Sequence, residues 1–254
     1  MSRSPVVEMR AVHKRFGGVQ AVRDVTLSLH AGEIVGLLGH NGTGKSTLIQ
    51  LLSGALELDA GSILVDGAPV RMRSPRDARR RGIETLYQDL ALADNLDAVA
   101  NLFLGRELTN RWGLLDDSAM ERAARAVIQR LNPQFPDLAS PVAKLSGGQR
   151  QTVALARAVH FHARVLILDE PTAALGPQES RLVTDAILQC RRDGLALLLV
   201  THDLDDVFEL SDRVVIMRSG RIVAERRSAD ITRDEALQLI IAGRAQSDGD
   251  VTPG

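Results

Sequence analysis

A glycine-rich loop of eight residues constrains this chain more than any other feature of its sequence. Residues 39–46 read Gly-His-Asn-Gly-Thr-Gly-Lys-Ser and fit the pattern G-x-x-x-x-G-K-[ST] at every fixed position. An apolar run over 34–38 precedes the loop, and a helical pattern over 46–53 follows it. A buried strand, a glycine-rich turn and a helix start in this order aim backbone N–H groups at phosphate oxygens. The loop therefore predicts a nucleotide-binding fold built around a sheet.

The side chains of the glycine-rich loop have separate expected roles. Lys45 is expected to reach the β- and γ-phosphates, and the Ser46 hydroxyl is expected to ligate Mg²⁺. His40 is expected to point outward and to take no part in the chemistry. The expected nucleotide contacts are Gly39, Asn41, Gly42, Gly44, Lys45, Ser46 and Thr47. The pattern alone leaves kinases, GTPases, ATPases and recombinases open.

Four continuous apolar runs predict strands that are buried on both faces, as in a parallel sheet. They cover residues 34–38, 165–168, 196–200 and 214–217. Alternating residues over 25–29 and an Asp-Gly turn at 66–67 predict shorter strands in the first third of the chain. The expected fold class is α/β. It is a P-loop NTPase core with a mainly parallel sheet, an N-terminal antiparallel β subdomain and an α-helical insertion subdomain.

Helical patterns occupy the segments between these runs. Capping patterns place helix starts at Ser118 and at Thr232. Another helix is expected to begin at Pro177 and to end at Gly194, and the last helix is expected to close at Gly243.

The chain has no internal repeat and no linker between two halves. We expect a single domain over residues 1–244 and a flexible polar tail over 245–254. Residues from about 89 to 162 contain helical segments and no good strand, so they are expected to form the helical subdomain.

Two adjacent acids end one of the apolar runs. Asp169 and Glu170 follow directly on residues 165–168. Burying unpaired charge is costly, and ligands of parallel sheets collect at the carboxyl ends of strands. Asp169 is therefore expected to hold Mg²⁺, and Glu170 is expected to be the general base that polarises the attacking water.

Composition argues against several classes of function. The formal net charge is −1 and aromatic residues make up 3% of the chain, so neither a basic field nor a base-stacking surface indicates a nucleic-acid partner. No apolar run is long enough to span a bilayer, and the single cysteine, Cys190, suits a reducing cytoplasm. The arginine run over 71–81 is expected to form a solvated helix face.

The peptide Leu-Ser-Gly-Gly-Gln at 145–149 precedes a helical run over 150–162. At this peptide the chain resembles the ATP-binding subunits of ABC transporters, whose signature peptide reads the same way. Its position between the glycine-rich loop and Asp169 makes the resemblance specific. Ser146 is expected to cap the helix and to expose N–H groups as a second anion site. The expected phosphate contacts here are Ser146, Gly147, Gly148 and Gln149.

Single residues extend the resemblance. Gln88 lies where the family has a glutamine that senses Mg²⁺ and the attacking water. His202 matches the switch histidine that contacts the γ-phosphate. Phe16 aligns with the aromatic residue that stacks on adenine, although an ordinary aromatic at a strand end would also fit. One position departs from the pattern, because Gly176 stands where the family has an aspartate that helps link the two ATP sites of a dimer.

Segments 74–79, 82–85 and 101–107 are similar to ATPase subunits of bacterial monosaccharide importers of fructose or ribose type. The resemblance implies an ATPase that binds ATP and Mg²⁺ at the cytoplasmic face of the cell membrane. It implies a second ATPase chain, transmembrane permease subunits and, indirectly, a sugar-binding protein as partners, and no nucleic acid. Two alternatives stay open: a soluble ABC ATPase that acts on DNA or ribosomes, and a regulatory subunit that hydrolyses ATP only weakly.

Overall fold

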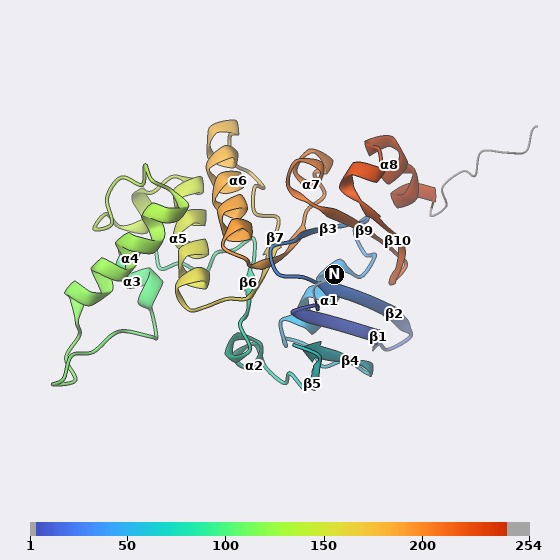
Figure 1. Cartoon of the computed structure of the whole chain (residues 1–254), viewed down its shortest axis with the longest axis horizontal. Helices are drawn as coiled ribbons and strands as arrows, with labels where there is room; N and C mark the ends of the chain where they lie inside the picture. The colour runs from blue at the N-terminus through green and yellow to red at the C-terminus, as the bar shows by residue number, and fades with distance from the viewer. Residues whose placement is uncertain (1–3, 243–254) are drawn as a thin grey trace, which may run out of the picture.

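Two sheets form the centre of the chain (Figure 1). The structure is a computed structural model, and it describes residues 4–242. A six-stranded sheet has the order β10-β9-β3-β8-β7-β6, and a four-stranded sheet has the order β2-β1-β4-β5. The expected α/β fold with an antiparallel β part is confirmed, whereas the tail expected over 245–254 lies outside the described residues.

The six-stranded sheet is parallel except at one edge, where β10 is antiparallel to β9. Its strands are β3 (Ile34–Leu38), β6 (Ile83–Leu86), β7 (Val165–Asp169), β8 (Ala196–Val200), β9 (Arg213–Arg218) and β10 (Arg221–Arg227). The four apolar runs of the sequence are β3, β7, β8 and β9. β6 has no continuous apolar run that would predict it, because Glu84 and Thr85 interrupt its apolar pattern.

Helices cover this sheet on its two faces (Figure 1). Within residues 4–242 the helices are α1 (Lys45–Leu52), α2 (Pro75–Arg80), α3 (Ala98–Phe103), α4 (Asp117–Leu131), α5 (Gly147–His160), α6 (Pro177–Arg192), α7 (Leu204–Leu210) and α8 (Arg233–Ala242), with 3-10 turns at Val142–Lys144 and Ser228–Asp230. Of these, α3 and α4 pack on α5 rather than on the sheet. None of the helices within residues 4–242 is long and apolar enough to cross a membrane. The arginines of α2 and its flanks are exposed, as expected.

Successive residues of the central strands face different cores. In β7, Leu166 and Leu168 pack with residues of α3 to α6, whereas Val165 and Ile167 pack with α1 and the four-stranded sheet. All four side chains are fully buried. Burial on both faces is the reason why this strand is a continuous apolar run rather than an alternating one.

The four-stranded sheet is antiparallel and lies over α1 (Figure 1). Its strands are β1 (Val7–Phe16), β2 (Val19–Leu29), β4 (Ala60–Val65) and β5 (Ala68–Val70). Asp66 and Gly67 connect β4 to β5 with φ values of 51° and 77°. Two positive φ values make a mirror-image turn whose twist matches that of the strands, so the predicted hairpin is confirmed.

The predicted helix starts had different outcomes. The start at Ser118 is wrong, because Asp116 Oδ1 accepts a hydrogen bond from Ala119 N at 2.9 Å and α4 begins at Asp117. Aspartate and serine cap helices about equally well, so the local pattern could not choose between them. The start at Thr232 is confirmed, since Thr232 N donates to Glu235 Oε2 at 2.7 Å.

Two helix ends were predicted, and one of them lies within the described residues. The helix expected from Pro177 to Gly194 is α6, which is capped at Asp193, and Gly194 has φ 90°. The expected end of the last helix at Gly243 lies outside the described residues. Residues 89–162 contain α3, α4 and α5. The only β pairing within this segment is two isolated bridges, Asp97 with Pro141 and Thr109 with Leu115.

Candidate nucleotide site

A cavity of about 960 Å³ lies at the carboxyl ends of the parallel strands. It brings the glycine-rich loop, which follows β3, together with residues that follow or end β6, β7 and β8. Of the residues singled out in the sequence, its lining includes Asn41, Gly42, Gly44, Lys45, Ser46, Thr47, Gln88, Asp169 and Glu170. The structure thus places nine of the expected site residues around one space, which is named the phosphate cavity below.

Two glycines determine the path of the glycine-rich loop. Gly39 has φ 154° and Gly44, the cap of α1, has φ 105°. A Cβ atom on Gly39 would lie 2.4 Å from the carbonyl oxygen of Met217, and one on Gly44 would lie 2.3 Å from that of Ala21. The backbone is therefore clamped between β9 and β2, and neither position has room for a side chain.

Lys45 is the cation of the loop. Its Nζ donates to the carbonyl oxygens of Gly39 at 2.5 Å and of His40 at 3.0 Å. Burial lowers the pKa of Lys45, and the Glu170 and Asp169 carboxylates offset only part of this decrease. The N–H groups of the first turn of α1 have no acceptor inside the helix. An ammonium beside free helix-start N–H groups forms a cradle that fits an anionic phosphate chain.

Three oxygen donors line the cavity near this cation: the Ser46 hydroxyl, the Gln88 amide and the Asp169 carboxylate. Burial raises the pKa of Asp169, the neighbouring Glu170 carboxylate adds to the rise, and Lys45 opposes it. Mg²⁺ prefers hard oxygen ligands, with one or two carboxylates completed by water and phosphate oxygens. The donor set present in the chain fits that ion.

Glu170 is held by the segment that follows β8. Its Oε2 accepts from Thr201 Oγ1 at 3.1 Å, and its Oε1 accepts from His202 N at 3.1 Å. The Nδ1 atom of His202 lies 2.9 Å from the same Oε1. This hydrogen bond, and then the charge of Glu170, raise the pKa of His202. His202 is exposed and does not line the phosphate cavity, but it contacts the expected base directly.

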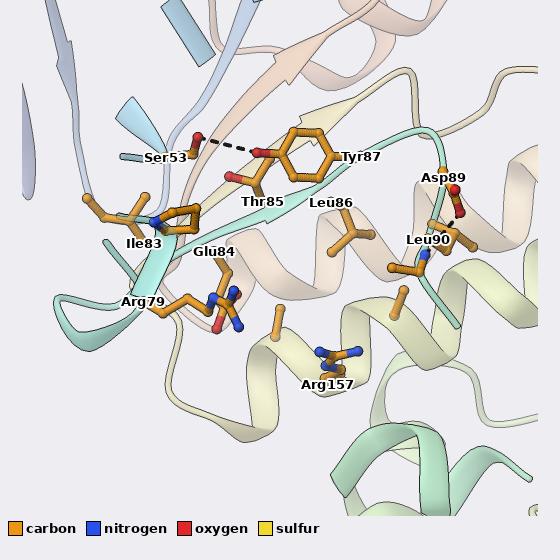
Figure 2. Close-up of a pocket in the computed structure, with 14 residues that line it drawn as sticks. Ser53, Arg79, Ile83, Glu84, Thr85, Leu86, Tyr87, Asp89, Leu90 and Arg157 are labelled. Atoms are coloured by element: carbon orange, nitrogen blue, oxygen red, sulfur yellow. Dashed lines mark hydrogen bonds between the residues drawn. The ribbon is translucent and has the colours of Figure 1, made fainter. Parts of the chain in front are cut away.

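Gln88 lies on the segment after β6 and lines two cavities. Besides the phosphate cavity it borders a space of about 300 Å³ that Gly147 and residues 173–175 also line. The residue before it, Tyr87, donates from Oη to Ser53 Oγ at 3.3 Å, as Figure 2 shows. Because Ser53 is the C-cap of α1, this bond ties the far end of the loop's own helix to the Gln88 segment.

A smaller charged pocket lies beside β6 (Figure 2). It has a volume of about 180 Å³, and Arg79, Glu84 and Arg157 line it together with Tyr87 and Leu90. Burial raises the pKa of Glu84, while Arg106, Arg79 and Arg157 oppose the rise. The pocket therefore joins α2, β6 and α5 and presents two arginines around one half-buried carboxyl group.

The residues 146–149, named the signature turn below, lie at the start of α5. Ser146 Oγ accepts from Gln149 N at 3.4 Å, and Gln149 Oε1 accepts from Ser146 N at 2.9 Å. This reciprocal pair is a capping box and agrees with the expected N-cap. None of the four residues lines the phosphate cavity. Within one chain the structure does not bring the signature turn and Lys45 into one site.

Phe16 also lies apart from the phosphate cavity. Its side chain is 47% exposed, and Lys14 Nζ lies 5.7 Å from the centre of its ring. The sequence analysis missed part of the cavity wall, which consists of Arg15, residues 18–21, Arg23, Ser219 and Gly220. Gly220 N donates to Thr43 O at 2.9 Å, so a turn 177 residues away supports the loop. No motif spacing signals such contacts.

Comparison with known proteins gives the family. The family model for ABC transporters matches residues 22–173, which is more than half of the chain. The chain belongs to the ABC transporter family. The resemblance seen at the signature turn is thereby confirmed.

Several members of this family that are similar in sequence to this chain are named as sugar-import subunits. A xylose/arabinose import ATP-binding protein of Sulfolobus acidocaldarius is 41% identical over 93% of this chain and 94% of its own length. A fructose import ATP-binding protein of Rhizobium meliloti is 42% identical over 96% of each chain. A ribose import ATP-binding protein of Rubrobacter xylanophilus is 45% identical over 93% of this chain, which spans 47% of that relative's length.

Solved structures share the fold. An ATP-binding cassette of an ABC transporter, solved in its ADP conformation, superimposes with a TM-score of 0.79 at 24% identity and covers 93% of this chain and 95% of its own. A dimeric cassette bound to ADP and phosphate superimposes with a TM-score of 0.71 at 23% identity, over 87% of this chain and 98% of its own. The ABC fold is therefore shown from sequence and from structure.

Proposed function

We propose that this chain is the ATP-hydrolysing subunit of an ABC importer for a monosaccharide and that it works as one half of a dimer. The observation that carries the proposal is the phosphate cavity, where the glycine-rich loop meets Gln88, Asp169 and Glu170. The sugar-import names of relatives that are 41–45% identical support the class of cargo.

ATP would be held by its phosphates in the cradle of the glycine-rich loop. Lys45 supplies the counter-charge, and the first-turn N–H groups of α1 supply hydrogen bonds. Ser46, Asp169 and Gln88 would hold Mg²⁺, which neutralises charge on the β- and γ-phosphates when it is bound. Phe16 is proposed as the adenine contact, because β1 carries it to the rim formed by Arg15 and residues 18–21.

Glu170 is proposed as the general base. Thr201 and His202 orient its carboxylate by hydrogen bonds, so it is already fixed at the cavity wall. A base positioned in this way accepts a proton from water as that water attacks the γ-phosphate. His202 contacts Glu170 and would reach the γ-phosphate from the same segment.

The second half of each site would come from the partner chain. The signature turn is a helix start of the kind that suits a phosphate, but in the single chain Gly147 N and Gln149 N donate to Glu179 and Ser146, and the turn lies outside its own chain's phosphate cavity. Twofold pairing would set Lys45 of one chain opposite Ser146 of the other and would generate two equivalent sites. Each ATP would thus be enclosed by two chains.

The transport pathway would belong to permease subunits. No helix within residues 4–242 is long and apolar enough to cross a membrane, so the pathway would need membrane-spanning partners. The charged pocket beside Gln88 and Tyr87 is proposed as the place where a permease segment docks (Figure 2). The chain would then sit at the cytoplasmic face of the membrane, and a sugar-binding protein would act on the permease from the opposite side.

Reconstitution tests this proposal directly. The chain is assembled with the permease subunits, and ATP hydrolysis is measured with and without a monosaccharide-loaded binding protein. We expect slow turnover for the chain alone and stimulation in the full assembly, whereas Lys45→Ala abolishes tight ATP binding. Stimulation by DNA or ribosomes instead of the loaded binding protein would show the proposal to be wrong.

A further inference from the structure

One carboxylate joins two loops that belong to different ATP sites in the proposed dimer. Glu179 lies in the first turn of α6, and its Oε1 accepts from Gly147 N of the signature turn at 3.1 Å. Its Oε2 accepts from Gly176 N at 3.4 Å. The two N–H groups are separated by 29 positions along the chain and meet on one side chain.

Close packing supports the same junction. A Cβ atom on Gly147 would lie 2.4 Å from Leu175 Cδ2, and one on Gly148 would lie 3.0 Å from the Glu179 carbonyl oxygen. The signature turn therefore lies directly against residues 175–179, and a side chain on Gly147 would have to displace the end of the Leu175 side chain. A displacement of one loop pushes on the other.

The loop from Glu170 to Gly176 is itself a compact unit. Ala173 N donates to Glu170 O at 3.2 Å, and Leu175 N donates to Thr172 O at 3.2 Å. Its first residue is the proposed base, and its last residue is held by Glu179. The junction thus connects the base, which acts on the chain's own ATP, with the signature turn, which would face the partner's ATP.

We propose that Glu179 is the positioning residue that couples the two ATP sites of the dimer. This inference rests on the proposed function. It also accounts for Gly176, which stands where an aspartate usually links the sites. In this chain the link is moved three residues along, to a side chain that accepts hydrogen bonds from both loops.

The coupling can be tested with four variants of the full chain. Glu179→Ala removes both acceptors, and Glu179→Gln keeps only one amide oxygen. Gln178→Ala is the matched control on the exposed side of the same turn. In the fourth variant, Glu179→Ala is combined with Gly176→Asp, since a Cβ atom on Gly176 meets nothing within 4 Å.

The first measurement is hydrogen exchange of the Gly147 amide in the chain alone. We expect exchange to be at least about fivefold faster in Glu179→Ala, because a hydrogen bond to a charged acceptor is lost. Unchanged exchange would mean that the contact does not exist in solution, and the inference would be overturned.

The second measurement is the ATP dependence of hydrolysis in the assembly with permease subunits. Two coupled sites give the wild type a Hill coefficient above 1 and at most 2. For Glu179→Ala we expect a coefficient near 1 and a half-saturating ATP concentration about fivefold higher or more. Glu179→Gln is intermediate, Gln178→Ala behaves as wild type, and Gly176→Asp restores the coefficient.

Failure of the coupling differs from failure of the proposed function. A wild-type assembly that hydrolyses ATP with a Hill coefficient of 1 refutes the coupling alone. So does faster Gly147 exchange in Glu179→Ala with an unchanged Hill coefficient, since the contact is then only structural. An assembly that does not hydrolyse ATP refutes the proposed function, and the coupling falls with it.

Discussion

The phosphate cavity and the signature turn both present N–H groups at the start of a helix, but different parts of the molecule hold them in place. The glycine-rich loop is clamped by carbonyl groups of two strands, at Ala21 and Met217. The signature turn is held by its own capping box and by the side chain of Glu179. Strand backbones in a packed sheet are rigid, whereas a half-exposed side chain can release its contact. The glycine-rich loop therefore suits chemistry that needs a fixed geometry, and the signature turn suits a contact with a partner that can form and break.

The largest expected effect lies in the phosphate cavity. Glu170→Gln should keep ATP binding and lose turnover by roughly two to four orders of magnitude, the usual scale for a removed general base. Steady-state hydrolysis and equilibrium ATP binding measure the two quantities. Glu209→Gln, an exposed acid on α7, is the matched control and should behave as wild type. Wild-type turnover in Glu170→Gln would show that Glu170 is not the general base.

The difference in clamping can be measured as stability. Gly39→Ala should lower the free energy of unfolding by roughly 2 kcal/mol or more, because its Cβ atom would meet the Met217 carbonyl at a positive φ. Gly176→Ala meets nothing within 4 Å at φ −72°, so its loss should be limited to that of a poorer helix N-cap, about 1 kcal/mol or less. Urea unfolding of both variants gives the comparison. Equal losses would show that the loop is not clamped as described.

Mixing two inactive chains tests whether the two halves belong to one site. Lys45→Ala breaks the phosphate cavity, and Ser146→Arg blocks the signature turn. A mixed dimer of the two has one doubly broken site and one intact site. By twofold symmetry an equal mixture recovers at most about a quarter of wild-type hydrolysis, and less if both sites must act together.

Crosslinking separates the reasons for a failed recovery. Cysteines are placed at Asn41 in one chain and at Ser146 in the other, because a side chain on Gly147 would displace Leu175 Cδ2. The native Cys190 is buried and its pKa is raised to about 12, so it should not react. A crosslink between chains that depends on ATP supports the shared site. Its absence in verified dimers contradicts it.

The smallest expected effect concerns the contact between His202 and Glu170. Since Glu170 raises the pKa of His202, the charged histidine stabilises the folded chain. This contribution is fully present below about pH 6.5, the unfolded value, and is lost as pH rises through the higher folded value. Relative to His202→Gln, the wild type should be more stable at pH 6 by less than about 1 kcal/mol, as for an exposed ion pair. Urea unfolding from pH 6 to 9 should show the difference vanish.

Much of the fold could be predicted because its strands are buried on both faces. The runs at β3, β7, β8 and β9 could be identified as strands without any contact information. β6 could not, because it is an edge strand with Glu84 and Thr85 at its centre. β10 is the opposite edge and is mostly charged and exposed, so its sequence has no strand pattern either.

The residues of the candidate site also divide into those that could be placed from sequence and those that could not. Residues that follow a buried strand could be placed at the carboxyl end of the sheet, and the structure puts Lys45 and Asp169 around one cavity. The support that Ala21 and Gly220 give to the loop depends on long-range packing, which leaves no local pattern. Spacing along the chain does not say which loops meet, so the expectation of a second anion site at Ser146 came from the family resemblance, and the structure places Ser146 outside that cavity.

The hydrogen bond between Tyr87 and Ser53 connects the C-terminal end of α1 to the segment after β6. The helix has eight residues, so it is about 12 Å long. Its first turn borders the phosphate cavity, and its capping residue at the other end contacts the wall of the pocket in Figure 2. A displacement of α1 along its axis would act on Tyr87 through this hydrogen bond. The helix thus connects the phosphate cavity to the charged pocket by a route that does not include Gln88.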